Sequence, residues 1–334
     1  MSDAKLQKVV LPPDFIDLSF GEPVVVTKAF YKAINRFGDP FKMPTIQDLL
    51  KWTYQPAAGK PDLVSLLEQK HGAKVVVGNG AKHVLNCALY SMKRAGAQSA
   101  WLDIPYYPAS PQFIESVGLV RSTDQSADVR LVTSPNNPDG KNYSNDELLQ
   151  ISSKGPTIHD AAYYTPIYLP SNQDPINIGD IQIYSASKMY GISGVRIGYA
   201  VCHNDRYYQD MTNFIEMTTA GVSAPSQDIM RNVELFFNDN PNLLDSFQRE
   251  ARASITEARN LLSTIDSDVL EIDSTEANSM FAWAKVGPAL NAEAAKVYIL
   301  PGELFGKPGY VRMNIAQPKE ILIEAIRRLN NNKN

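Results

Sequence analysis

The chain has little cysteine and little histidine, which excludes two common ways of equipping a fold. Its 334 residues include 2 cysteines and 4 histidines. Cys87 and Cys202 fall within apolar helix and strand patterns, so we expect free, buried thiols in a reducing compartment and no disulfide framework. The histidines show no metal-ligand spacing, so we predict no metal site.

The chain also lacks an excess of positive charge and any long apolar run. Its 32 Lys and Arg residues and 36 Asp and Glu residues give a formal net charge of -4. The basic residues are dispersed, so we expect no nucleic-acid partner. No stretch approaches the roughly 20 apolar residues that span a membrane. Residues 1–14 resemble neither a signal peptide nor a transit peptide, so we expect a cytoplasmic protein without membrane contact.

What the chain does contain is an alternation of short apolar strands and helices, from about residue 39 to residue 220. This pattern predicts an α/β fold, with a large, doubly wound, mostly parallel sheet covered on both faces. After residue 225 the sequence pattern changes to helices rich in Arg and Glu and to further short strands. This pattern predicts a small α+β domain. We place the large domain at 36–229 and the small domain at 230–334, completed by the N-terminal segment 1–35.

The C-terminal part offers several elements from its apolar periodicity. We predict helices at 226–237, 243–265 and 320–329, and strands at 269–272, 280–285, 297–300 and 311–315.

One lysine lies in a segment rich in Ser and Gly, between two apolar runs. Residues 181–184 and 196–201 read as buried strands, so we expect Lys188 on a loop between core strands, where scaffolds usually hold reactive groups. Arg196 follows downstream. An amine that captures an aldehyde, beside a cation that binds phosphate, is one interpretation. A surface lysine in a hairpin is the other.

Two more polar motifs follow predicted strands. A turn after the apolar run 129–132 exposes the amide of Asn137. The strand that begins at residue 157 ends with the carboxylate of Asp160, and the phenol of Tyr163 comes three residues later. A plain turn and a helix cap are the alternatives for these two motifs.

A glycine turn links another predicted strand to a helix. Residues 74–80 read as a strand that enters the turn, and residues 81–95 carry the apolar spacing of a helix. Free backbone N–H groups at the start of such a helix form a ready anion site, although an ordinary strand-to-helix connection has the same pattern.

Taken together in this order, these segments resemble the fold type I family of enzymes that depend on pyridoxal phosphate, specifically the aminotransferases. The resemblance runs from about Asp17 to Ala316. Four segments are more similar to the branch that contains plant tryptophan aminotransferases and alliinase: residues 132–140, 159–164, 221–227 and 281–283.

The resemblance implies pyridoxal phosphate as the cofactor and assigns its reactive end to four residues. Lys188 forms the resting aldimine and then moves the substrate proton. Asp160 keeps the pyridine nitrogen protonated, which lets the ring draw electrons. Asn137 and Tyr163 hydrogen-bond the phenolic oxygen, and we count Lys188, Asp160 and Tyr163 as the catalytic residues.

The resemblance also assigns the phosphate and the ring face. Backbone groups of the glycine turn contact the phosphate together with a hydroxyl and a guanidinium: Gly80, Ala81, Lys82, Ser185 and Arg196. Tyr107 stacks on the ring, although packing in a core or an interface is its alternative role. Tyr54 resembles the tyrosine that family members lend to the neighbouring subunit's phosphate.

Two positions depart from the pattern of the branch. Its members usually carry hydroxyl residues where Ala81 and Lys82 stand, so two side-chain hydrogen bonds to the phosphate are lost. The branch's own tyrosine, shortly after a Gly-Asp-Pro motif, falls at Val26 in this chain.

Arg312 lies in an apolar run that reads as a strand, where an unpaired guanidinium is costly and an anionic partner is expected. An internal Asp or Glu is one such partner. The resemblance implies another, the α-carboxylate of an amino-acid substrate, and it places Asn137 and Gly21 beside that substrate. A planar guanidinium suits a carboxylate.

We therefore predict an aminotransferase that moves the amino group of an L-amino acid, with aromatic or apolar donors favoured, to a 2-oxo acid. The resemblance implies a homodimer with shared active sites. Phe281 and Trp283 are the residues that favour an aromatic donor, unless they belong to the core. The alternatives are a C–S lyase that acts by β-elimination and a non-catalytic binding or regulatory protein of the same fold.

Overall fold

The computed structural model of the chain describes residues 10–35, 47, 50–273 and 279–333. Its larger sheet has seven strands in the spatial order β2 (Lys74–Gly78), β8 (Gly198–Cys202), β7 (Ile181–Ser185), β6 (Thr157–Asp160), β5 (Val129–Thr133), β3 (Ser99–Leu102) and β4 (Val120–Ser122). Strand β8 is antiparallel to both of its neighbours, and the other pairings are parallel. The mostly parallel sheet is as the sequence predicts.

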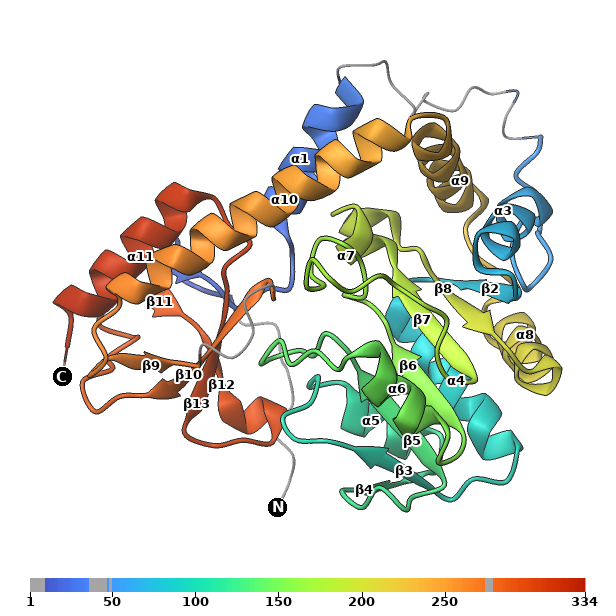
Figure 1. Cartoon of the computed structure of the whole chain (residues 1–334), viewed down its shortest axis with the longest axis horizontal. Coiled ribbons are helices and arrows are strands. Elements are labelled where there is room, and N and C mark those ends of the chain that lie inside the picture. The colour runs from blue at the N-terminus through green and yellow to red at the C-terminus, as the bar shows by residue number, and fades with distance from the viewer. Residues whose placement is uncertain (1–9, 36–46, 48–49, 274–278, 334) are drawn as a thin grey trace.

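Helices cover both faces of this sheet (Figure 1). One face packs against α4 (Ala81–Arg94), α5 (Ser110–Ser116) and α8 (Asp205–Thr219). The other packs against α1 (Val24–Asn35), α3 (Pro61–His71), α6 (Asn145–Ser152), α9 (Ala224–Asp239) and α10 (Pro241–Leu261).

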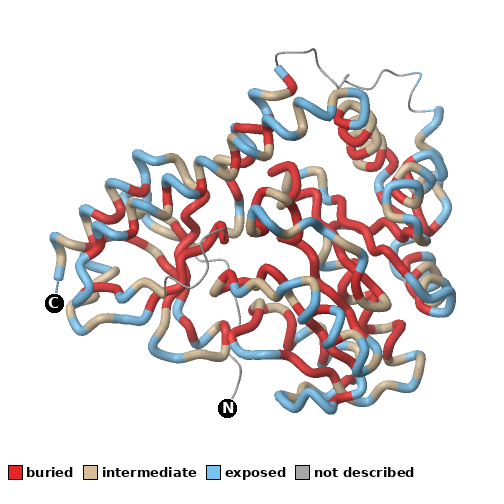
Figure 2. The backbone as a smooth tube through the Cα atoms, in the orientation of Figure 1, coloured by how far each residue is buried: buried red, intermediate tan, exposed pale blue. Residues whose placement is uncertain are grey.

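Alternation along β2 shows how the sequence produces the two faces. Val75 and Val77 belong to the core beneath α3, while Val76 belongs to the core beneath α4. Successive side chains of a strand point to opposite faces, so a run of valines is buried on both sides. The strands accordingly form the buried centre of the molecule in Figure 2.

A smaller sheet lies toward the C-terminus. Its antiparallel strands have the spatial order β12 (Leu300–Pro301), β13 (Tyr310–Asn314), β10 (Phe281–Val286) and β9 (Leu270–Ile272). A separate parallel pair joins β1 (Ile16–Asp17) to β11 (Val297–Tyr298). Helix α11 (Lys319–Asn331) packs on this part, and the long helix α10 runs from α9 to α11 (Figure 1).

Two predicted elements differ in detail from those observed. The strand predicted at 297–300 is two strands, because β11 pairs with β1 while β12 pairs with β13. The helix predicted at 243–265 ends at Leu261 and continues as a 3-10 turn over Leu262–Thr264. The domain boundaries remain a prediction, and position 36 lies outside the described residues.

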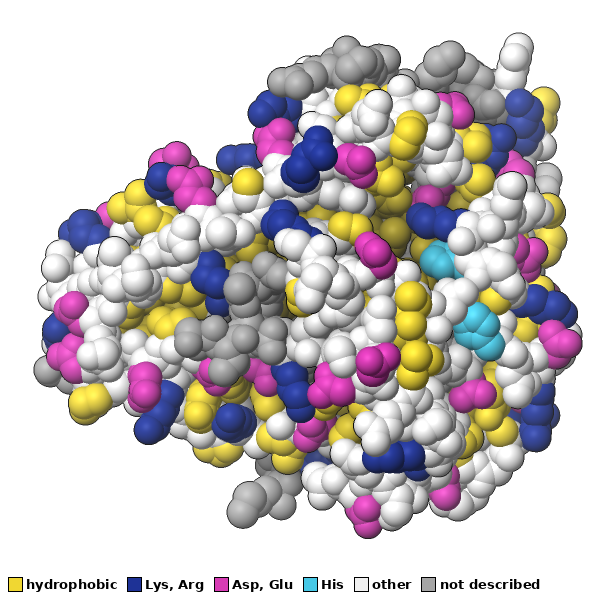
Figure 3. Space-filling view, in the orientation of Figure 1, with side chains coloured by type: hydrophobic (Ala, Val, Ile, Leu, Met, Phe, Trp, Pro, Cys, Tyr) yellow, Lys and Arg dark blue, Asp and Glu magenta, His cyan; other side chains and the backbone are white. Residues whose placement is uncertain are grey.

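Three further observations concern the charges on the surface, the helices and the candidate metal ligands. Basic and acidic side chains are interspersed over the face of the molecule that Figure 3 shows. Within the described ranges, no helix combines the length and the apolar character needed to cross a bilayer. In the same ranges, no group of three or more His, Cys, Asp or Glu side chains could hold a metal ion.

Candidate active site

The larger sheet brings several chain segments to one edge. Strands β2, β5, β6 and β7 run the same way, so their carboxyl ends meet there. Strand β8 is antiparallel, so it begins at that same edge, two residues after Arg196. A pocket of about 730 Å³ opens at this edge.

The opposite wall of the pocket comes from segments that lie far apart in the sequence. It is formed by residues around Asp17 and by Tyr298, Leu300 and Arg312 of the smaller strands. All but two of the predicted site residues line the pocket: Gly21, Ala81, Lys82, Tyr107, Asn137, Asp160, Tyr163, Ser185, Lys188, Arg196 and Arg312. The two others are Gly80 and Tyr54.

Lys188 lies in the short helix α7 (Ala186–Met189), so the expectation of a loop was wrong in this detail. The chain turns at once after β7, because the N–H of Tyr190 returns to the carbonyl of Ala186. The Lys188 ammonium donates to the carbonyl of Gly21. Burial, and next the charge of Arg312, lower the pKa of Lys188 to about 8.

The backbone that carries Lys188 is fixed by contacts with other elements. The carbonyl of Lys188 accepts from the Tyr168 hydroxyl at 3.1 Å. The Tyr190 hydroxyl donates to the buried carboxylate of Glu234 at 2.8 Å. These contacts hold the turn from behind, so the amine meets the pocket in a fixed position.

Asp160 ends strand β6 and is 8% exposed. Its Oδ1 accepts from the N–H of Ala162 at 3.2 Å, and no helix begins there, so it does not act as a helix cap. Burial raises the pKa of Asp160 to about 6. Among the residues that the structure describes, no cation forms an ion pair with this carboxylate. A cation supplied from outside would therefore favour its charged form.

The glycine turn before α4 approaches β8 very closely. Gly80 has a φ of +83°, and a Cβ added there would lie 2.5 Å from Nη2 of Arg196. A Cβ added at Gly198 would lie 2.4 Å from the backbone nitrogen of Ala81. Gly80 therefore contacts Arg196 at the edge of the pocket, although it does not line the cavity itself.

The start of α4 leaves donors free for an anion. No side chain caps the helix at Gly80. In the described part of the chain, no backbone carbonyl accepts from the N–H groups of Ala81 and Lys82. Such groups carry part of the positive end of the helix dipole. The ammonium of Lys82 lies 5.7 Å from the centre of the Tyr107 ring, and both side chains line the pocket.

Arg312 is 4% exposed and has no acidic partner among the described residues. Nη1 donates to Oδ1 of Asn137 at 2.8 Å, and Nη2 donates to the carbonyl of Ser19. Its guanidinium lies 4.1 Å from the centre of the Phe281 ring, and its buried Nε has no partner in the described part of the chain. Burial lowers the pKa of Arg312 to about 10. Within the described chain, the internal ion pair considered above does not form.

Asn314 is a site residue that the sequence reasoning missed. Its Nδ2 donates to the carbonyls of Phe20 and Glu22, each at 2.7 Å, and its Oδ1 accepts from the N–H of Ala316 at 2.9 Å. The amide thus binds the segment that presents the Gly21 carbonyl. Its position two residues after Arg312 on a strand places both side chains on one face, which was the available signal.

Other pocket residues were given no role from the sequence, although Thr133 and Ala162 lie inside two of the segments that carry the family resemblance. The Ser193 hydroxyl donates to Glu22 at 2.6 Å, next to the Lys188 turn. The further lining residues without a prediction are Asp17, Ser19, Phe20, Leu85, Pro108, Thr133, Ala162, Ser187, Tyr298 and Leu300. Trp283, by contrast, is 1% exposed and packs on Phe305 and Tyr310, so it belongs to the core and does not line the pocket.

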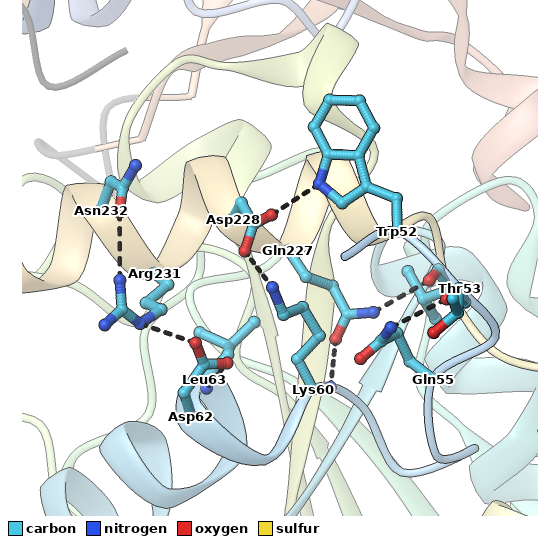
Figure 4. Close-up of polar contacts among 11 residues, drawn as sticks. Trp52, Thr53, Gln55, Lys60, Asp62, Leu63, Gln227, Asp228, Arg231 and Asn232 are labelled. Atoms are coloured by element: carbon cyan, nitrogen blue, oxygen red, sulfur yellow. Dashed lines mark hydrogen bonds and ion pairs between the residues drawn. The ribbon is translucent and has the colours of Figure 1, made fainter. Parts of the chain in front are cut away.

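Tyr54 does not reach the pocket of its own chain, and its side chain is 91% exposed. The loop that carries it is nevertheless fixed to α9 (Figure 4). The Trp52 indole donates to Asp228 at 2.9 Å, the Lys60 ammonium pairs with the same carboxylate, and the N–H of Lys60 donates to Gln227 at 2.7 Å. The tyrosine is thus held outward, and its contact with a neighbouring subunit remains a prediction.

Comparison with known protein families identifies the chain. The model of the family described as "Allinase" matches residues 68–236, which is more than half of the sequence. The chain belongs to the allinase family. The match spans the glycine turn, the strand-end residues and Lys188, and it ends within α9.

Relatives of this allinase family member carry aminotransferase names. Tryptophan aminotransferase-related protein 1 of Oryza sativa subsp. japonica is 36% identical over 47% of this chain and 37% of its own length. Tryptophan aminotransferase-related protein 2 of Arabidopsis thaliana is 30% identical over 64% and 52%. The match thus spans about a third to a half of these plant proteins. A probable aspartate/prephenate aminotransferase of Aquifex aeolicus is 26% identical over 84% and 83%.

Solved structures show the same fold. A double mutant of Thermus thermophilus aspartate aminotransferase superposes with a TM-score of 0.76, at 20% identity, over 95% of this chain and 91% of the other. The aspartate aminotransferase of Thermotoga maritima superposes with a TM-score of 0.72, at 19% identity, over 95% and 92%. These findings confirm the predicted family, the fold type I class and pyridoxal phosphate as the cofactor of that family.

Proposed function

We propose that this allinase family member is an aminotransferase that depends on pyridoxal phosphate and moves the amino group of an L-amino acid to a 2-oxo acid. One observation carries the proposal. A partly buried amine, a buried carboxylate and a buried guanidinium without an acidic partner among the described residues share one pocket: Lys188, Asp160 and Arg312. The names of the relatives support the same reaction class.

The pocket fits the cofactor at both of its charged ends. The free N–H groups of Ala81 and Lys82, with Ser185 and Arg196, would hold the phosphate. Asp160 would pair with the protonated ring nitrogen and thereby regain a partner for its buried charge. Bound there, pyridoxal phosphate supplies an electron sink for the bond that breaks at the substrate Cα.

Lys188 would supply both the amine that holds the cofactor and the base that moves the proton. A lysine with a pKa near 8 is neutral more often at neutral pH than an exposed lysine, and the neutral amine is the nucleophile. Tyr168 and Glu234 hold its backbone turn, so the amine reaches the same place in each turnover.

Arg312 would bind the substrate α-carboxylate with its planar donors, and Asn137 would keep the guanidinium in register. Its burial strengthens this preference, because a carboxylate would compensate a charge that has been removed from water. Binding of the carboxylate would thus fix where the Cα of the amino acid lies relative to Lys188.

Aromatic and apolar donors are the substrates that we favour. Phe20, Leu85, Tyr298 and Leu300 give the pocket apolar walls, and Glu22 would repel a second carboxylate. The plant relatives' names point the same way. The homodimer with Tyr54 shared between subunits, the cytoplasmic location and the domains at 36–229 and 230–334 accompany this proposal as predictions.

The test is a donor panel with a mapped cofactor site. The protein with pyridoxal phosphate should be yellow, and borohydride reduction followed by peptide mapping should place the adduct on Lys188. Tryptophan or phenylalanine with a 2-oxo acid should yield the matching new amino acid. Lys188→Ala should lower the rate at least ~10³-fold. An adduct on another lysine would contradict the site, and release of ammonia with pyruvate from a β-substituted donor would indicate the C–S lyase.

A further inference from the structure

His83 lies in the third position of helix α4 and contacts the glycine turn that precedes the helix. Its Nδ1 accepts from the backbone N–H of Asn79 at 3.1 Å. The neighbouring N–H of Gly80 is taken by the carbonyl of Gly78 at 2.8 Å. Both amides of the turn are therefore occupied inside the protein, whereas those of Ala81 and Lys82, directly after it, are not.

The contact with Asn79 fixes the state of the imidazole. A ring nitrogen that accepts carries no proton, so the neutral ring has its proton on Nε2. That Nε2 is buried and has no hydrogen-bond partner among the residues that the structure describes. A buried donor without a partner costs stability, so Nε2 does not favour this orientation of the ring. The hydrogen bond that Nδ1 accepts from Asn79 is therefore what keeps the ring in place.

The shape of the turn leaves little freedom for other solutions. Gly80 and Gly198 allow approaches that no Cβ would permit, one toward Arg196 and one toward the nitrogen of Ala81. A small rotation of the turn would therefore move the free N–H groups relative to Arg196. In many helices, a Glu or Gln in the third position bonds back to the N–H at the helix start, and His83 makes the corresponding bond one residue earlier.

We propose that His83 is a positioning residue for the phosphate of pyridoxal phosphate: its Nδ1 holds Asn79 and so aims the N–H groups of Ala81 and Lys82 into the pocket. His83 itself does not line the pocket. The inference rests on the proposed function, because it assigns a task to the same pocket. If His83 only filled space, its replacement would weaken the binding of pyridoxal phosphate and of pyridoxal alike.

The experiment compares two ligands that differ by the phosphate. Apoprotein is titrated with pyridoxal phosphate and with pyridoxal, and the dissociation constants are read from the change in absorbance. His83→Phe keeps a flat ring and removes the acceptor. We expect its dissociation constant for pyridoxal phosphate to rise about fivefold to tenfold, the range for loss of a helix cap, and that for pyridoxal to stay unchanged.

His83→Asn is the conservative variant, because its Oδ1 stands where Nδ1 stood. It should restore binding of pyridoxal phosphate to within about twofold of the wild type, well inside the effect of a lost cap. Hydrogen exchange gives a second readout, because the Asn79 amide should exchange faster in His83→Phe and not in His83→Asn. His203→Phe, at the far end of β8 from Gly198, is the matched control and should change neither constant.

Several outcomes would overturn the inference. His83→Phe that binds pyridoxal phosphate as the wild type does would show that the turn needs no holder. An equal loss of affinity for both ligands would assign His83 a general packing role. If His83→Phe does not fold, failure of His83→Asn to bind pyridoxal phosphate would contradict the acceptor role. Wild-type protein that binds neither ligand would overturn the proposed function itself, which is a different result.

Discussion

The two ends of the pocket are built in different ways. The end assigned to the cofactor uses strand ends and turns between Gly78 and Gly198, all at one edge of one sheet. The end assigned to the substrate joins segments that lie far apart in the sequence. Arg312 contacts Asn137 and Ser19 across 175 and 293 positions, and Asn314 contacts Phe20 across 294.

The charges at the two ends differ in the same way. Arg196 is exposed, and its Nη1 donates to the carbonyl of Ser193 at 2.9 Å. Arg312 is almost fully buried over an aromatic ring. An anion that binds Arg196 competes with the water around this guanidinium, whereas an anion that binds Arg312 meets a guanidinium with little water around it. The substrate end should therefore depend more on exact geometry, and the cofactor end more on the number of donors.

The first way to test this comparison is Asp160→Asn, which should produce the largest effect on rate. The amide no longer favours a protonated ring nitrogen, so we expect transamination to fall ~10³-fold while some pyridoxal phosphate stays bound. Cofactor content by absorbance and single-turnover rates with a good donor measure the two quantities separately. Turnover near the wild-type value would make Asp160 a structural residue.

The second test concerns the substrate end. Arg312→Lys keeps the charge but loses the planar pair of donors, so kcat/KM should fall by about 2 to 4 kcal/mol of transition-state binding, with a higher KM. Binding of pyridoxal phosphate should change little. Steady-state kinetics with an amino acid and with its amine lacking the carboxylate provide the measurement. Equal wild-type activity toward both compounds would remove the proposed role of Arg312.

The third test concerns the free energy of unfolding of the apoprotein. Burial raises the folded-state pKa of Asp160 from 3.8 to about 6, so its ionisation destabilises the folded apoprotein as pH rises through that window. Asp160→Asn removes this cost and keeps an oxygen for the Ala162 N–H. The apo variant should be more stable than apo wild type by about 3 kcal/mol at most above pH 6, with no difference below pH 4.

Urea unfolding of both apoproteins at pH 4 and pH 8 measures this difference. Pyridoxal phosphate should reverse the order, because only the wild type gains a charged partner for the ring nitrogen. A wild type that is the more stable apoprotein at pH 8 would show that the carboxylate already has a compensating partner.

The cofactor end could be predicted well from sequence because its signals are local. Each signal is an apolar run followed within a few residues by a turn, so the placement of Asn137, Asp160 and Lys188 at strand ends needed no knowledge of distant contacts. The short helix around Lys188 was missed because four residues leave no periodic pattern. The residue roles at this end still await the experiments above.

The substrate end could be predicted only in part, because it depends on which strands pair. The apolar run from Val297 to Leu300 gives no sign that its halves join different partners. Asn314 reads as an ordinary polar strand residue until the carbonyls of Phe20 and Glu22 are placed beside it. Arg312 was identified from its apolar setting, while its contacts with Ser19 and Asn137 required the fold.

The parallel pair β1–β11 has a consequence for how the protein is made. Ile16 pairs with Val297, about 280 positions later, and a ribosome that adds about 5 to 20 residues per second needs roughly 15 to 60 s to cover that distance. By then the segments that form the cofactor end have all been synthesised. The segment around Ile16 must therefore wait for β11, and the part of the site assigned to the substrate is assembled after the part assigned to the cofactor.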